Sequence, residues 1–581
     1  MPSAAYDKFP TIEIPDAAPD DAVSGWTAAT AAIRAAGDRL APSAAIVVVD
    51  LYPGARRDEI VAALAGPDAL VIDPAEALKP AAEIEAMLSR FLTTDRVFGY
   101  LAPFRMAEFF DADRLARLGA EAGAAKAAGR TVLVVGTGAA LVHPGDVLVH
   151  ADMPRWEIQR RMRAGMPNWT ADNGYEDFLR KYKRGYFVEW RTADRHKMAL
   201  HGRADFFLDT TEAGAPRLVR GAAMRTALAG LVHRPFRVVP FFDPGVWGGQ
   251  WMRERFDLPA EAPNYAWGFD CVPEENSLRL SFGGVVTEIP AQNLVLAHPE
   301  ALLGPRVHAR FGPEFPIRFD FLDTIGGGNL SLQVHPDTGY IHDTFGMAYT
   351  QDESYYILEA GPEASIYLGL RNGVAAADLT DAIAVAQDGG AHPEIERYVN
   401  RFPIRKHDHF SIPSGTVHCS GHDCVVLEVS ATPFIFTFKL WDWGRIGLDG
   451  KPRPVHLEHG RRVIREERDT DWVETNLLGQ VEALDAGTGW REERTGLHPL
   501  EFIETRRHWF TAPVEHDTAG SVHVLNLIEG SRAVVESPTN AFAPFVVGFA
   551  ETFIVPAAVG RYRVTPLGNG EHATLRASVR L

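Results

Sequence analysis

The chain has 581 residues, 46% of them hydrophobic and 23% charged, which are the proportions of a globular protein long enough for two or three domains. The net charge of −18 argues against a nucleic-acid or anionic-membrane partner. No apolar run reaches the ~20 residues of a membrane-spanning helix, and no secretory-signal pattern opens the chain. Three cysteines are too few for a disulfide framework. We therefore expect a cytoplasmic protein.

Residues 1–235 have the pattern of a parallel α/β sheet. Residues 45–50 (AIVVVD) are a short, continuous apolar run, followed by a turn and a predicted helix over residues 57–65. The pattern repeats at residues 130–136, after an alanine-rich predicted helix over residues 115–128. Apolar strands that alternate with helices are typical of parallel sheets buried on both faces.

The loop at residues 50–58 (DLYPGARRD) lies where a strand-to-helix phosphate loop would lie. A functional phosphate loop needs G-x-x-x-x-G-K-(S/T), because glycines let backbone amides approach phosphates and the lysine reaches their oxygens. Here Gly54 is the single glycine and no lysine follows. The loop therefore predicts a domain that has lost triphosphate binding.

Residues 155–163 and 179–191 are rich in basic side chains and resemble uridine-kinase-type nucleoside kinases. Their basic residues have two interpretations: an anion site, or a solvated amphipathic helix on an inactive scaffold, which we favour. The residues in question are Arg160, Arg161, Arg163, Lys181, Lys183 and Arg184. The resemblance implies a degenerate P-loop-kinase-like α/β domain over residues 1–235.

From residue 236 the pattern changes to short strands separated by glycine, proline and asparagine turns, which is typical of all-β domains. An alanine- and acid-rich stretch predicts a helical insertion near residues 375–400, and charged residues 451–480 predict a helical or irregular connector. Strands return from about residue 522, and residues 552–562 repeat the turn pattern without a histidine. We expect a metal-binding β domain over residues 236–460, and a connector with a second, metal-free β domain over residues 461–581.

Four side chains near the middle of the chain form a mixed nitrogen and oxygen ligand set. Gln333 and His335 alternate on the strand S-L-Q-V-H-P-D (331–337), so they point to the same face. Glu353 begins the next apolar run, and His418 follows the tight turn P-S-G-T-V (413–417). Two imidazoles, a carboxylate and an amide oxygen suit zinc or another divalent ion, and the absence of thiolates from the set is unlike a closed structural zinc site. We predict one ion per chain.

These motifs resemble the type I mannose-6-phosphate isomerases of the cupin superfamily, over roughly residues 236–581. That family carries a Ser-x-Gln-x-His-Pro strand, a downstream glutamate and a Pro-x-Gly-x-x-His turn, and the segments 247–249, 315–323, 427–433 and 441–445 resemble it further. The resemblance implies double cupin barrels and the four metal ligands above. It also implies that Arg445 is catalytic and that Trp247 and Ser331 bind substrate.

Two lysines of that family are replaced here. Asp320 stands where the family places a lysine near the substrate phosphate, and a carboxylate there repels a phosphate by roughly 1–4 kcal/mol. Gln351, which we also expect to contact substrate, replaces a lysine proposed in acid–base work and cannot transfer a proton at neutral pH. Asp320 and Asp352 become the candidate general bases.

The resemblance implies a metal-dependent aldose–ketose isomerase that interconverts mannose 6-phosphate and fructose 6-phosphate through an enediol. An isomerase or epimerase of an unphosphorylated sugar is the alternative that Asp320 and Gln351 favour. A non-catalytic sugar-sensing protein that keeps the metal site is a third hypothesis. In each case the partner is a small sugar or sugar phosphate.

Overall fold

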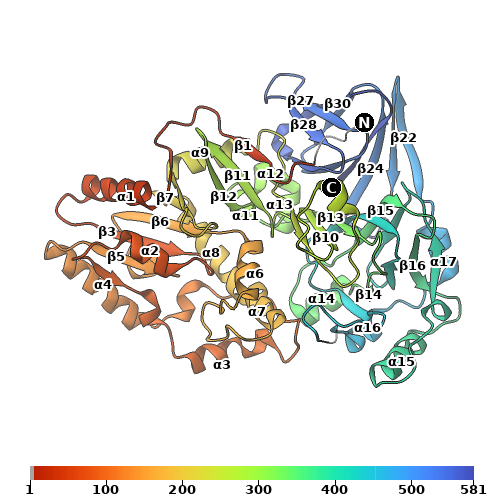
Figure 1. The fold of residues 1–581 in the computed structure, drawn as a ribbon, viewed down its shortest axis with the longest axis horizontal. Helices are drawn as coiled ribbons and strands as arrows, with labels where there is room; N and C mark the ends of the chain where they lie inside the picture. Colours follow the sequence, from red (N-terminus) through yellow and green to blue (C-terminus); the bar gives the residue numbers. More distant parts are fainter. Residues whose placement is uncertain (1–5, 452, 497, 581) are drawn as a thin grey trace. The chain divides into compact units, whose positions relative to one another are not determined.

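The computed structural model describes residues 6–451, 453–496 and 498–580, and the chain divides into two compact units (Figure 1). The α/β unit comprises Thr11–Gly230 and Glu274–His298. The β unit comprises Leu231–Pro273, the chain from Pro299 onward and the residues before Thr11. The sequence patterns indicated a boundary near residue 235 but gave no sign that the segment Glu274–His298 returns to the first unit. No helix in the described parts of the chain is long and apolar enough to cross a membrane.

A seven-stranded sheet is the centre of the α/β unit, with the order β2-β8-β7-β6-β3-β5-β4. The five strands from β7 to β4 pair in parallel, as the apolar runs predict, and β8 and β2 add antiparallel at one edge. The returning segment contributes a second sheet in the order β1-β11-β12. The strands are β1 Thr11–Glu13, β2 Ala22–Ser24, β3 Ile46–Leu51, β4 Leu70–Ile72, β5 Val132–Gly136, β6 Val147–Asp152, β7 Phe206–Asp209, β8 Arg217–Arg220, β11 Ser277–Phe282 and β12 Val285–Pro290.

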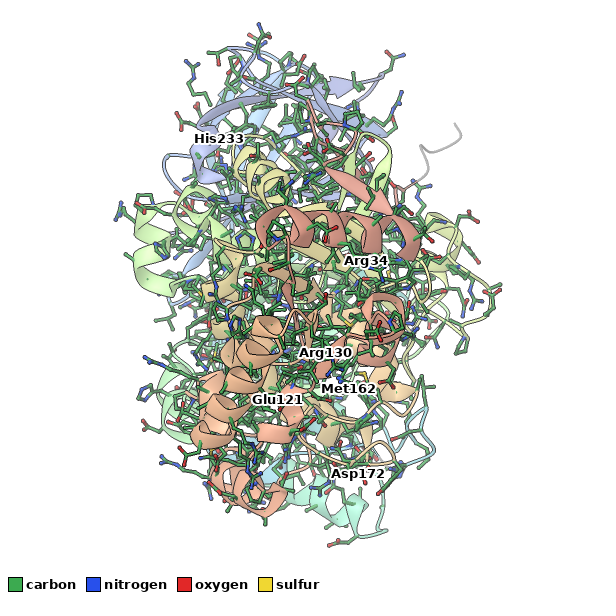
Figure 2. The ribbon with its side chains drawn as sticks, turned by 90° about the vertical axis from the view of Figure 1, so that its left-hand side faces the viewer. Arg34, Glu121, Arg130, Met162, Asp172 and His233 are labelled. Carbon is green, nitrogen blue, oxygen red and sulfur yellow. The ribbon has the colours of Figure 1, made fainter. Side chains whose placement is uncertain are left out.

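Amphipathic helices cover this sheet. Ile33 of α1 packs into the core that contains Val47 and Val149, whereas Arg34 of α1 and Glu121 of α4, labelled in Figure 2, are exposed. The helices are α1 Trp26–Leu40, α2 Arg57–Leu64, α3 Ala81–Leu92, α4 Ala112–Ala127, α5 Ala139–Val142, α6 Arg155–Arg163, α7 Phe178–Arg184, α8 Trp190–His201, α9 Gly221–Leu231 and α11 Gln292–Ala297. A π-helical turn, Gly185–Glu189, joins α7 to α8.

Side chains of α6 fill the space beside the loop that follows β3. The carbonyl of Gly54 accepts a hydrogen bond from Arg161 at 2.9 Å, and a Cβ atom at Gly54 would lie 3.0 Å from Ile158. A phosphate cradle needs open backbone amides on such a loop. In this loop the glycine instead allows close packing against a helix.

Four of the six basic residues that we interpreted as a solvated helix are buried (Arg161, Lys181, Lys183 and Arg184), so that interpretation is wrong for them, whereas Arg160 and Arg163 are exposed. Lys181, 2% exposed, donates to the carbonyls of Met162, Met166 and Gly174. Met162 lies on α6 and is labelled in Figure 2. Arg184 is buried as well, and its guanidinium forms ion pairs with the carboxylates of Glu85 at 2.7 Å and Glu189 at 3.2 Å. These cations are used to hold the unit's own backbone and carboxylates.

Two antiparallel sheets form the first part of the β unit, with the orders β18-β15-β20-β13-β10-β9 and β17-β16-β19-β14-β21. Their strands are β9 Phe241–Asp243, β10 Trp267–Cys271, β13 Ile317–Asp323, β14 Leu332–Val334, β15 Glu353–Ala360, β16 Ser365–Leu370, β17 Val399–Pro403, β18 His409–Ile412, β19 His418–Ser420, β20 Cys424–Ala431 and β21 Phe438–Trp441. The helices are α10 Trp251–Phe256, α12 Pro299–Leu303, α13 Pro305–Phe311, α14 Thr338–Phe345, α15 Ala376–Gln387, α16 Leu457–Val463 and α17 Thr470–Asn476. Helix α15 is the predicted insertion, and α16 and α17 lie in the predicted connector.

Two further antiparallel sheets form the C-terminal part, with the orders β22-β23-β24-β31-β26-β29 and β25-β30-β27-β28. Phe510, Leu525, Phe553 and Tyr562 lie in the core that these sheets share. The strands are β22 Val481–Gly487, β23 Trp490–Thr495, β24 Ile503–Phe510, β25 Val514–Asp517, β26 His523–Glu529, β27 Arg532–Glu536, β28 Phe545–Gly548, β29 Thr552–Val555, β30 Arg561–Leu567 and β31 His572–Val579.

Candidate metal centre

The structure brings His335, Glu353 and His418 together between the two sheets of the first part of the β unit. His335 follows β14, Glu353 begins β15 and His418 begins β19. The Nε2 atoms of His335 and His418 lie 3.2 Å and 2.6 Å from the two carboxylate oxygens of Glu353. All three side chains are at most 1% exposed, and their potential ligand atoms lie within 4.8 Å of one another. The three side chains therefore point at one buried position.

A glycine turn delivers His418 to this position. Gly415 has φ +89°, a conformation that residues with a Cβ rarely adopt, and its amide donates to the carbonyl of His335 at 2.8 Å. The amide of Ser414 donates to Asp352 at 2.9 Å. Burial raises the pKa of Asp352, and its carboxylate fixes the turn that carries His418.

The orientation of the imidazoles fits a bound metal ion. His418 Nδ1 lies 2.8 Å from the carbonyl of Thr416, so an Nδ1–H donates there and the lone pair of Nε2 faces Glu353. The Nε2 of His335 likewise faces a carboxylate oxygen of Glu353, 3.2 Å away, while its Nδ1 is buried without a hydrogen-bond partner among the described residues. Two imidazole nitrogens and a carboxylate are a donor set that zinc and similar divalent ions accept.

Gln333 lies beside the triad. It pairs with His418 across β14 and β19, and its side-chain amide lies 3.2 Å from His418 Nε2. The assignment of nitrogen and oxygen in a glutamine amide can be exchanged by a half-turn, which presents the oxygen to the same position. The four residues of the predicted ligand set therefore lie close together.

A second buried acidic cluster adjoins the triad. Asp320 and Glu428 are direct partners across β13 and β20, and they are 2% and 5% exposed. Burial raises the pKa of both carboxyl groups, to about 6 for Asp320, against the opposing effect of Arg318. Gln351 connects the clusters, because its amide nitrogen lies 3.2 Å from Glu353 and 3.3 Å from Glu428.

Glu428 was not singled out from the sequence. Glu428 lies in a segment that carried the family resemblance. Its alternation with Ser430 along the strand indicated that both side chains point to the same face, and Asp320 lies directly opposite on the paired strand. Lys439 pairs with Gln333 across β14 and β21, and burial together with Arg453 lowers its pKa to about 7. Lys439 lies outside the motifs that carried the resemblance.

Ser331, Trp247 and Arg445, the other residues predicted to bind substrate or take part in catalysis, each have their own set of neighbours. Ser331 is buried directly before β14, in the stretch that carries Gln333. Trp247 is 1% exposed and packs edge-on against Trp267, with ring centres 4.8 Å apart. The guanidinium of Arg445 pairs with Asp442 and donates to the carbonyl of Asn329 at 2.7 Å.

Comparisons with known proteins give two kinds of match, one to a family model and one to individual proteins. A family model described as a domain of unknown function (DUF8485) matches residues 25–233, a description that names no activity. The chain is 27% identical over 223 residues to the mannose-6-phosphate isomerase of Streptococcus mutans serotype c, and 28% identical over 237 residues to the mannose-6-phosphate isomerase ManA of Bacillus subtilis. About 40% of this chain is homologous to mannose-6-phosphate isomerases.

These matches are partial. They cover 38% and 40% of this chain, and the chain spans 64% of the Streptococcus protein and 69% of the Bacillus protein. Among solved structures, the mannose 6-phosphate isomerase of Bacillus subtilis aligns with 59% of this chain and 99% of its own, at 19% identity and a TM-score of 0.48.

Proposed function

We propose that the protein is a metal-dependent aldose–ketose isomerase, and that mannose 6-phosphate and fructose 6-phosphate are its first candidate substrate pair. The observation that carries the proposal is the convergence of His335, Glu353 and His418 on one buried position. Support for the substrate pair comes from relatives named mannose-6-phosphate isomerase.

The residues that would hold the ion are His335, Glu353 and His418, with the amide oxygen of Gln333 as a fourth ligand. A divalent ion bound there supplies Lewis-acid stabilisation of negative charge on the sugar oxygens at C1 and C2. The chain's own contribution is to fix the ligands: the Thr416 carbonyl orients His418, and the Gly415 amide ties its turn to His335.

Proton transfer is the task of the acidic cluster in this proposal. An aldose becomes a ketose when a base moves a proton from C2 to C1 and a second proton moves from the C2 hydroxyl to the C1 oxygen, with an enediol between the two steps. Burial raises the pKa of Asp320 to about 6, so this carboxyl is largely ionised at neutral pH, and burial also raises the pKa of Glu428. Asp320 is then the base and Glu428 its proton-sharing partner.

The second candidate is an isomerase or epimerase of an unphosphorylated sugar. It is favoured by Asp320 and Glu428, which are direct partners on adjacent strands: both can hydrogen-bond sugar hydroxyls, and an ionised Asp320 repels a phosphate. The buried oxygen Oδ1 of Asp320 lies 3.4 Å from Arg318 and has lone pairs enough to accept a hydrogen bond from a sugar hydroxyl as well.

The decisive experiment is an NMR assay of deuterium exchange, at C2 of mannose, glucose and their 6-phosphates and at C1 of the matching ketoses. We expect exchange with one or more of these sugars, its loss after metal is removed by a chelator, and its return when zinc is added. The sugar that exchanges distinguishes the two candidates. A protein that binds metal and sugar but gives no exchange with any of them contradicts the enzyme proposal and supports a sensing role.

A further inference from the structure

Arg155 occupies the place where an α/β sheet commonly holds an anionic ligand. It is the first residue of α6 and follows β6 at the carboxyl edge of the parallel strands. The side chain is 4% exposed. Its two terminal nitrogens lie 2.6 Å from Asp194 and 2.7 Å from Glu274, both within the α/β unit.

A second guanidinium meets the same carboxylate oxygen. Arg191 of α8 lies 2.8 Å from Glu274 Oε1, the atom that Arg155 contacts. The neighbouring carboxylate, Glu275, accepts hydrogen bonds from Gln159 and from Tyr182, the latter at 3.1 Å. The start of the returning segment is therefore held through its carboxylates by donors from α6, α7 and α8.

Arginine guanidinium groups are the donors that proteins favour for binding phosphate and carboxylate groups, and here two of them donate to one oxygen. The basic residues first suspected of binding an anion are engaged elsewhere, as the carbonyl contacts of Lys181 illustrate. We propose that Arg155 and Arg191 form an oxyanion site for a small phosphate or carboxylate, and that the chain fills this site with its own Glu274.

A resident ligand on the same chain explains why such a site stays closed to free anions. A tethered group competes at an effective concentration of about millimolar or higher, so a weakly bound free anion is displaced. Removing the Glu274 carboxylate leaves two cations with less compensation at a buried position, which is destabilising. A free oxyanion then gains access to the vacated place and restores stability.

The test is thermal unfolding of the full chain with Glu274→Ala, together with hydrogen exchange of peptides that cover α6 and α8. We expect the midpoint of the affected transition to fall by roughly 10 °C. Inorganic phosphate or acetate should return part of that shift and restore protection of both helices, whereas chloride at equal ionic strength should not. The relative effects of phosphate and acetate tell which oxyanion the site prefers.

Two matched variants keep the test specific. Glu212→Ala removes a surface carboxylate that pairs with Arg217 in the same unit, and should show neither the loss nor the anion rescue. Adding Arg191→Met to Glu274→Ala should abolish the rescue. If the alanine variant does not fold, Glu274→Gln keeps the shape and should show a smaller anion-dependent shift. The proposal is overturned if neither phosphate nor acetate raises the unfolding midpoint of either Glu274 variant. It is also overturned if the anions raise the midpoint equally when Arg191→Met is added.

Discussion

Asp320 and Glu428 face each other as direct partners across β13 and β20, and Gln351 joins Glu428 to the metal-site carboxylate Glu353. Arg318 lies 3.4 Å from Asp320 and 3.9 Å from Glu428, so one cation serves two acids. At 2% and 5% exposure, two neighbouring carboxylates cannot both stay ionised cheaply. The pair therefore keeps a proton close to the proposed reaction centre.

Reversing the charge at position 320 tests whether Asp320 determines the preference between phosphorylated and free sugars. Asp320→Lys should raise kcat/KM for mannose 6-phosphate relative to mannose by about tenfold or more, because a repulsion of roughly 1–4 kcal/mol becomes an attraction. Asp320→Asn removes the charge without adding one and should give an intermediate ratio. Efficient turnover of mannose 6-phosphate by the unsubstituted protein, unchanged in Asp320→Ala, would show that Asp320 does not set specificity.

Loss of one metal ligand should remove both the ion and the activity. Glu353→Gln and His418→Ala should lower the zinc content, measured by elemental mass spectrometry, well below one ion per chain and reduce deuterium exchange by at least about a thousandfold. His422→Ala, in the hairpin after β19, is the matched control and should keep both. Full activity in a variant that no longer holds zinc would contradict the metal-dependent mechanism.

Three histidines buried within the C-terminal sheets should make their unfolding sensitive to acid. Burial lowers the pKa of His508, His516 and His523, and Arg576 adds to the effect. Because the folded pKa values lie below the unfolded value near 6.5, the unfolded chain binds protons first, and stability falls as pH drops below about 6.5. His516→Gln should reduce the slope by about 1.4 kcal/mol per pH unit, measured by urea unfolding between pH 7 and pH 5. An unchanged slope would mean that His516 is already protonated in the folded protein.

Lys181 should matter for stability through its contacts with the backbone. Its ammonium group donates to three backbone carbonyls, those of Met162, Met166 and Gly174. Lys181→Met leaves these acceptors without their donor and should lower the free energy of unfolding by about 3 kcal/mol in urea titrations. Lys79→Met, which removes a partly exposed pair with Glu83, should change it by less than about 1 kcal/mol.

The parts of the fold that follow from local pattern were predictable from the sequence. The apolar run at residues 45–50 became β3, the alanine-rich stretch became α4, and the insertion near residue 380 became α15. The positions of His335 and His418 followed from strand alternation and a glycine turn. Side chains that depend on strand pairing were less accessible, because Glu428 acquires its meaning only from the register that sets it opposite Asp320.

The errors in the α/β unit have one physical origin. Charge patterns along a helix suggest a solvated face, but Lys181 and Arg184 are buried because carbonyls and carboxylates from distant segments satisfy them. The return of Glu274–His298 to this unit was also invisible, since its strands have the same composition as those of the β unit. In both cases the structure depends on contacts between segments that are far apart in the sequence, which local patterns do not reveal.

The segment Glu274–His298 also has a consequence for genetic manipulation of this protein. A truncation after residue 230 keeps Thr11–Gly230 on the N-terminal fragment. It separates from that fragment the segment Glu274–His298, which belongs to the same unit. Neither half of the gene therefore encodes a complete unit, and a swap of one unit between relatives requires four junctions instead of one. We expect the two units to be inherited together, and the loss of either through a single stop codon or start site to leave an incomplete core.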